Sequence, residues 1–336
     1  MMRPSLRMPW QPLAAWAAAA AVAAVPTWEQ WRLAAELDGA STYHVSMCRG
    51  GAETVALVEA LRADLGRLHA TAVTWGVPAA AVLAGLLLSV AGKAAPGRRL
   101  AGGLALTALA GPLTPVYFHP DECGPVAIFS GVWVAQVLEC VGIPEVCLLV
   151  AALLVLAASA PERPAGHPAG RGEPGAAWRR TAALALDYLV AVTVLALATQ
   201  ALGLDGAGLD LGERLLPEPG DTSSEAVVRA TLSAPLLFLY AWGFHLLRGR
   251  TPGKLLLGLR VAFPEGGGRV RRAALRALLF PVLVVMPGFG MIWLFLDGLC
   301  ALVDPDVRAA HDRFTGGRVV RARRRDAVRG GQAGVA

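Results

Sequence analysis

The sequence predicts an all-helical, multi-pass membrane protein. Of its 336 residues, 55% are hydrophobic and 17% are charged, and the mean hydropathy is +0.51, a balance that is unusual for a soluble globular domain. Several apolar stretches approach the roughly 20 residues that span about 30 Å of hydrocarbon. Short charged or Pro/Gly-rich connections separate these stretches. We therefore expect about six to seven membrane segments, the last of them broken or re-entrant.

An amino-terminal module, residues 1–160, is expected to contribute about four of the segments. The first covers 10–25 and follows Arg3 and Arg7, and its Ala-rich body fits either a membrane anchor or a cleavable signal peptide. An apolar stretch at 126–138 would extend the fourth segment backwards. The remaining predicted segments of this module are 70–91, 100–118 and 142–160.

A second membrane module follows an abrupt change in composition. Residues 161–177 are polar and rich in Pro and Gly, which is typical of an interdomain linker. The module itself is predicted at 178–322, and residues 323–336 form a basic tail that we expect to be flexible. Its apolar runs cover 181–202, 230–247 and 277–303.

Basic residues give the second module an orientation. The connection 248–276 is rich in Arg and Lys, and such residues in short loops stay on the cytoplasmic side. We therefore expect a cell-membrane protein whose linker and basic loops are cytoplasmic. A single crossing by 277–303 would place the Arg-rich tail outside. Because Pro and Gly at 286–290 permit a break inside a membrane helix, a hairpin that returns to the cytoplasm is the preferred solution.

Asp187 is the main candidate for a functional group. It lies about two helical turns after Arg180, so both charges share one helix face near the start of a membrane run. A carboxylate at this depth costs about 3 kcal/mol on insertion scales, so it should face protein or a wet cavity. Asp187 is then either a titrating or cation-coordinating group that Arg180 tunes, or half of a structural ion pair. The candidate partners for such a pair are Arg180, Arg250, Lys254 and Arg313.

Two further segments carry charge near the predicted membrane surface. In 249–261, Arg250, Lys254 and Arg260 alternate with leucines, which favours an interfacial turn that contacts anionic lipid headgroups. The spacing of its glycines does not fit a phosphate-binding P-loop.

The second charged segment is His311-Asp312-Arg313, just after the last apolar run. These residues either gate access to Asp187 or form a local cap. Asp297 and His245 are secondary candidates within apolar segments.

The second module resembles the RDD family of membrane proteins. Three elements carry the resemblance in order: Arg180 with Asp187, the segment 249–261, and 311–316 followed by two valines. Gly317 stands where the family usually has Thr, so a role for that hydroxyl is not expected here. The resemblance covers about 178–322 and implies a membrane domain for which a part in transport has been suggested.

Two functions remain open at the level of sequence. One is a transporter or transport subunit that handles a small cation or a proton at Asp187. The other is a non-enzymatic membrane scaffold, assembly factor or lipid-binding module with membrane-protein partners. We expect no enzyme centre, cofactor, metal site or nucleic-acid partner. Cys48, Cys123 and Cys140 fall in regions predicted outside or near the outer surface, so a disulfide between two of them and three unpaired thiols are both open.

Overall fold

A computed structural model gives the fold of the chain in two units. It describes residues 10–37, 56–91, 97–118, 126–159, 176–204, 209, 211–212, 215–218, 221–264, 268–304 and 306–321. The chain divides into two compact units, Met1–Gly166 and His167–Ala336. Of the residues that the structure describes, 77% are helical and few lie in strands, so the predicted all-helical class is confirmed.

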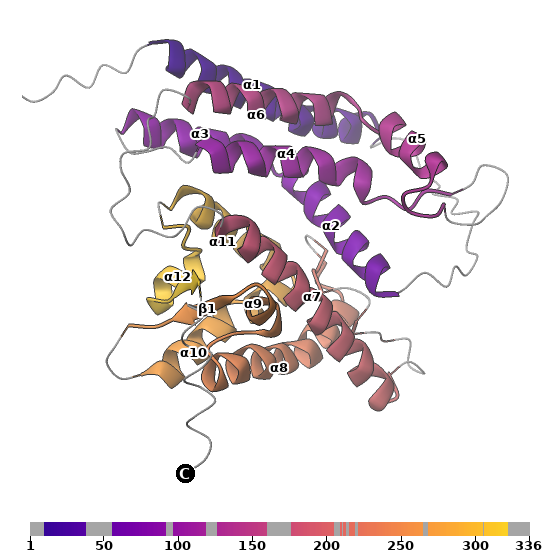
Figure 1. Ribbon diagram of the computed structural model, residues 1–336. Helices are drawn as coiled ribbons and strands as arrows, with labels where there is room; N and C mark the ends of the chain where they lie inside the picture. The colour runs from indigo at the N-terminus through magenta and orange to yellow at the C-terminus, as the bar shows by residue number, and fades with distance from the viewer. Residues whose placement is uncertain are drawn as a thin grey trace, which may run out of the picture. The chain divides into compact units, whose positions relative to one another are not determined.

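The first unit is a helical bundle. Its helices are α1 (Trp10–Leu37), α2 (Ala56–Thr74), α3 (Val77–Val90), α4 (Gly97–Leu113), α5 (Gly131–Glu139) and α6 (Ile143–Ser159). Within it, α1 packs on α3 and α6, and α4 packs on α6 (Figure 1). Trp16, Leu100 and Leu148 are fully buried in this bundle. A Cβ at Gly85 would lie 2.8 Å from the Trp16 ring, so the close packing there requires glycine.

Two predicted segments of the first unit are bent rather than continuous. The segment 70–91 breaks between α2 and α3, which meet at 61°, because Gly76 adopts a left-handed conformation with φ 68° just before Pro78. Within the stretch 126–138, α5 begins at Gly131 and meets α6 at 79° after a break, so the fourth predicted segment is a bent helix pair and not one straight helix. Helix α1 continues past the predicted end at residue 25. Cys48 and Cys123 lie outside the described residues, as do 161–175 of the predicted linker and the tail.

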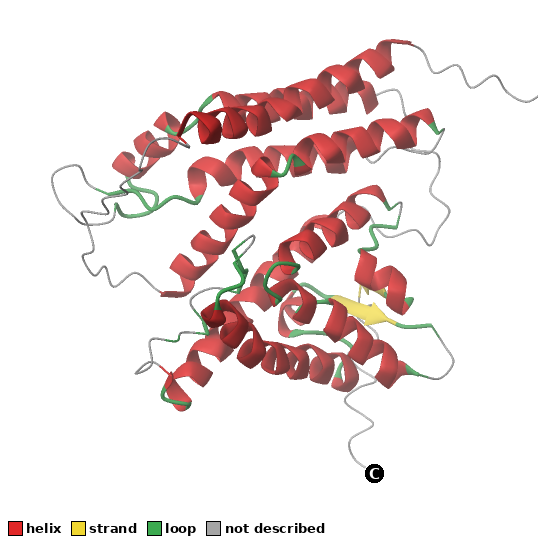
Figure 2. Ribbon diagram, turned by 180° about the vertical axis from the view of Figure 1, so that it is seen from behind, coloured by secondary structure: helices red, strands yellow, loops and turns green. Residues whose placement is uncertain are grey.

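The second unit contains helices and one short strand pair. Its elements are α7 (Ala176–Ala201), α8 (Ser224–Leu247), α9 (Pro252–Leu256), β1 (Leu259–Ala262), α10 (Arg269–Leu279), the 3₁₀ helix η2 (Val282–Val285), α11 (Gly290–Val303), α12 (Ala310–Thr315) and β2 (Arg318–Arg321). The strands, yellow in Figure 2, pair antiparallel with Val261 opposite Val319. Helix α7 packs on α9, and α8 packs on α10.

The strand pair was not expected from the sequence. The segment 249–261 was predicted to be an interfacial turn, but it forms α9 and then the start of β1, and its Leu259 and Val261 side chains are buried. The run 277–303 is interrupted, as predicted: α10 ends at Leu279 and α11 begins at Gly290. Residues between them form η2 and a turn.

Two of the described helices are long and apolar enough to cross a membrane, namely Trp178–Ala201 in α7 and all of α8. Counting each bent helix pair of the first unit as one span raises the number to four. The predicted total of six to seven segments stays a prediction. Helix α11 is apolar but has 14 residues, which is shorter than a full crossing requires.

Candidate functional site

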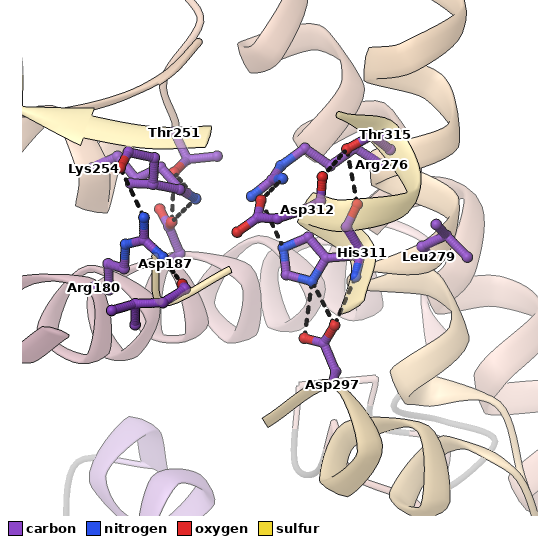
Figure 3. Close-up of polar contacts among 12 residues, drawn as sticks. Arg180, Asp187, Thr251, Lys254, Arg276, Leu279, Asp297, His311, Asp312 and Thr315 are labelled. Carbon is purple, nitrogen blue, oxygen red and sulfur yellow. Dashed lines mark hydrogen bonds and ion pairs between the residues drawn. The ribbon is translucent and has the colours of Figure 1, made fainter. Parts of the chain in front are cut away.

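The carboxylate of Asp187 in α7 is held by four donors from α8 and the region of α9. One oxygen accepts hydrogen bonds from the Tyr240 hydroxyl at 3.1 Å and from the Gly253 N–H at 2.8 Å. The other accepts a hydrogen bond from the Thr251 hydroxyl and lies 3.4 Å from the Lys254 ammonium. Figure 3 shows Asp187 pointing from its helix toward Thr251 and Lys254. The side chain is therefore enclosed by protein donors, and the residue is only 9% exposed.

The sequence Thr251-Pro252-Gly253-Lys254 explains this geometry locally. Thr251 is extended at the N-cap position of α9 and Pro252 occupies the first turn, where its missing N–H is no loss. The Gly253 N–H has no intrahelical partner so close to the helix start, and it donates to Asp187 instead. A Cβ at Gly253 would lie 2.2 Å from the Ala183 carbonyl oxygen and 2.9 Å from an Asp187 oxygen. Glycine is thus required where α9 meets α7.

Lys254 is the cation of this cluster. Its ammonium lies 3.1 Å from the Thr251 hydroxyl oxygen as well as near Asp187. Burial lowers the pKa of the Lys254 ammonium, and the Asp187 carboxylate opposes that shift. The two charges therefore stabilise each other in a poorly solvated place.

A second buried cluster joins α10, α11 and α12. Arg276 of α10 forms an ion pair with Asp312 of α12. The His311 ring nitrogen Nδ1 lies 2.8 Å from the carboxylate of Asp297 in α11, and the His311 backbone N–H donates to the same carboxylate at 2.9 Å. The Thr315 hydroxyl donates to the His311 carbonyl at 2.8 Å. The contacts with Arg276 and Asp297, drawn in Figure 3, fix the short α12 against two helices.

Burial and charge set the protonation states of this second cluster. Burial lowers the pKa of the His311 imidazole, and the Arg276 guanidinium lowers it further. The neutral ring then donates from Nδ1 to Asp297. Burial opposes ionisation of Asp312, but the charged Arg276 guanidinium outweighs it and holds the pKa of Asp312 below its ordinary value.

Arg180 and Arg313 form hydrogen bonds that connect further elements of the second unit. The Arg180 guanidinium donates to the main-chain carbonyls of Val307 and Val319, the latter at 2.8 Å, and so connects α7 with β2. Arg313 donates from Nε to the buried Asp304 at 2.7 Å, which links α12 to the end of α11.

The predicted site residues do not form one site in the structure but lie in separate clusters. Asp187 meets Lys254, one of its four candidate partners. His311 and Asp312 lie in the second cluster, where Asp297, a secondary candidate, receives the His311 hydrogen bond. The other secondary candidate, His245, is buried with Nδ1 against the Ala241 carbonyl oxygen. Of the predicted lipid contacts, Arg250 lies before α9 and Arg260 lies in β1.

Sequence reasoning did not assign site roles to Tyr240, Thr251, Gly253 or Arg276. Thr251 and Gly253 lie inside the Gly-Arg-Thr-Pro-Gly-Lys motif, so their position beside Lys254 was a usable signal. Arg276 was visible as a basic residue between Ala273 and Ala277, the small residues of the buried face of α10. Among the residues that the structure describes, no group of three or more His, Cys, Asp and Glu side chains could hold a metal ion.

We expect Gly253→Ala to destabilise the protein by about 1–3 kcal/mol, the usual cost of overpacking. The added Cβ would push α9 away from Ala183 and Asp187. Gly243→Ala in α8 is the matched control, because a Cβ there meets nothing within 4 Å. Thermal melts in detergent should show a lower Tm for the first variant alone. Equal Tm values for both variants would contradict the close approach of α9 to α7.

Stability should fall on mild acidification, and His311 is one of the buried groups that cause it. The pKa of the buried imidazole is lowered, so the unfolded state binds more protons as the pH drops through about 6.5, and folding weakens. Asp312 adds nothing in this window, since its lowered pKa matters only at more acidic pH. Between pH 7.5 and 5.5 we expect the Tm to drop by about 3 °C or more. The variant His311→Asn keeps a hydrogen-bond donor toward Asp297 but has no imidazole to protonate. Its Tm should therefore fall less over the same pH range. An unchanged pH dependence in that variant would be evidence against this role.

Comparison with known proteins supports the family resemblance. Residues 174–316 match the model of the RDD family. Comparisons with curated proteins and with solved structures found no match. The matched range includes both buried clusters, from Asp187 in α7 to Asp312 in α12. The protein is thus a membrane protein whose carboxy-terminal half is an RDD-family domain.

Proposed function

We propose that the RDD domain is a transporter or transport subunit in which Asp187 and Lys254 exchange a small cation for a proton. The observation that carries the proposal is the donor set around the Asp187 carboxylate. A lysine ammonium and the hydroxyl groups of Thr251 and Tyr240 gather at this carboxylate in a membrane helix. The ammonium occupies the place of a monovalent cation, and hydroxyl and carboxylate oxygens are the ligands that hard cations prefer.

The exchange follows from the charge balance of the pair. With Lys254 protonated, Asp187 is neutralised and the site needs no external ion. When Lys254 releases its proton, the carboxylate is left without a counter-charge, which favours entry of one small cation. The lowered pKa of Lys254 makes that release easier than in water. One cation therefore replaces one proton, and the net charge of the site is unchanged.

A second candidate function is a non-enzymatic scaffold, assembly factor or lipid-binding module. It is favoured by the fact that both oxygens of Asp187 already have protein donors. A satisfied, buried pair of this kind also serves to hold helices together. In this case the partners would be membrane proteins or lipids. Under either function we place the protein in the cell membrane, with its linker and basic loops on the cytoplasmic side.

We expect proteoliposomes with the full chain to couple proton movement to a gradient of Na⁺, K⁺ or Li⁺. Asp187→Asn removes the charge with little change in volume, so flux should fall at least about tenfold, an effect of roughly 1.4 kcal/mol or more. Flux is read from a pH-sensitive dye inside the vesicles, and thermal melts report whether each variant is folded.

Glu225→Gln is the control for this experiment. Glu225 lies in the first turn of α8, and its side chain is 61% exposed, so its loss should leave flux unchanged. Cation-coupled flux that persists in folded Asp187→Asn would rule out Asp187 as the coupling group. A folded wild type without flux for any of the three cations would favour the scaffold.

A further inference from the structure

An apolar groove lies between α8 and the α10–η2 segment. All of its lining residues are apolar, and it encloses about 340 Å³. They are Ala234, Pro235, Phe238, Leu239, Leu278 and Val282. Because α8 is one of the described helices long enough to span the membrane, the middle of this helix lies at the depth of the lipid acyl chains. The groove is therefore open to a hydrocarbon environment.

Helix α10 runs back along α8 from one end toward its middle. At its start, the Arg269 guanidinium donates to the Leu246 carbonyl at the end of α8, at 3.3 Å. Near its own end, Leu278 lines the groove with Phe238 and Leu239. The two helices pack against each other between these points. A molecule lying along α10 would thus extend from the end of the span to its interior.

One face of α10 changes from charged to apolar along this path. Arg271, Leu275 and Leu278 follow one another at i, i+4 and i+7, so they share one helix face. All three are exposed. The distance along the helix from Arg271 to Leu278 is about 10 Å, which fits within the roughly 15 Å of hydrocarbon in one leaflet.

The charged end of this face is strongly basic. Arg271 and Arg272 lie in the first turn of α10, and the guanidinium of Arg272 is placed by a bond to the Pro264 carbonyl at 3.2 Å. Arg269 adds a third cation at the same end. Guanidinium groups bind phosphate oxygens through several donors at once. This end of the face therefore complements an anionic headgroup.

We propose that an anionic phospholipid binds on this surface, with its phosphate at Arg271 and Arg272 and one acyl chain in the groove. The surface differs from the predicted contacts at Arg250, Lys254 and Arg260, since Lys254 faces Asp187 instead. The proposal does not depend on transport at Asp187. The headgroup determines the preference for anionic lipid, and the groove determines how firmly the lipid is retained.

The test is native mass spectrometry of the full chain in detergent, with dioleoyl phosphatidylglycerol or dioleoyl phosphatidylcholine added. We expect the wild type to prefer phosphatidylglycerol by about 25-fold, since each of the two arginines near a lipid surface contributes about a fivefold gain. The double variant Arg271→Gln, Arg272→Gln should lose this preference. The control is the double variant Arg98→Gln, Arg99→Gln in α4, which removes the same charge from the other unit. This control should keep the preference for phosphatidylglycerol.

A second variant pair tests the groove. Leu239→Trp fills it, whereas Leu197→Trp alters a residue of matched exposure on α7, since the two leucines are 58% and 59% exposed. Retention of both lipids should fall in the first variant alone, with unchanged Tm. Equal binding of the two lipids by the wild type would overturn the proposal. So would a preference that survives in the α10 variant, or a Leu239→Trp effect on oligomeric state with lipid retention unchanged.

Discussion

The neutralisation of one carboxylate inside a membrane helix determines how the second unit is arranged. Asp187 needs donors at a depth where water does not supply them, and the segment after α8 supplies them through Thr251, the Gly253 N–H and Lys254. This requirement places α9 against α7. It also determines where β1 begins, because the strand follows α9 after two residues.

In the second cluster, too, buried carboxylates are paired with protein donors, here between a different set of helices. Arg276 with Asp312, and His311 with Asp297, hold α10, α11 and α12 together. Arg180 extends the network by binding the carbonyl of Val319 in β2, opposite Val261 in β1. Within a bilayer, apolar side chains gain little by leaving lipid for protein, so specific polar contacts contribute much of the helix association. The charged residues thus contribute directly to the association of these helices.

The sequence was sufficient for the helical class and the family, and it singled out Asp187 as the main candidate, because apolar run length and intramembrane charge are strong local signals. It placed Lys254 among four candidate partners but could not choose between them, since the choice depends on where α9 packs. It missed the strand pair, because two four-residue strands carry too little periodicity and their pairing is long-range. Arg276 was taken only as an indicator of membrane orientation, because its burial depends on α12.

The most direct test of this account is a double-mutant cycle of Asp187→Asn and Lys254→Gln, measured as unfolding free energies in detergent. Each single variant leaves one charge without its partner, so each should be clearly destabilising, whereas the double variant should cost less than the sum. We predict a coupling energy of at least about 1 kcal/mol. Effects that add within about 0.5 kcal/mol would contradict the claim that Lys254 neutralises Asp187.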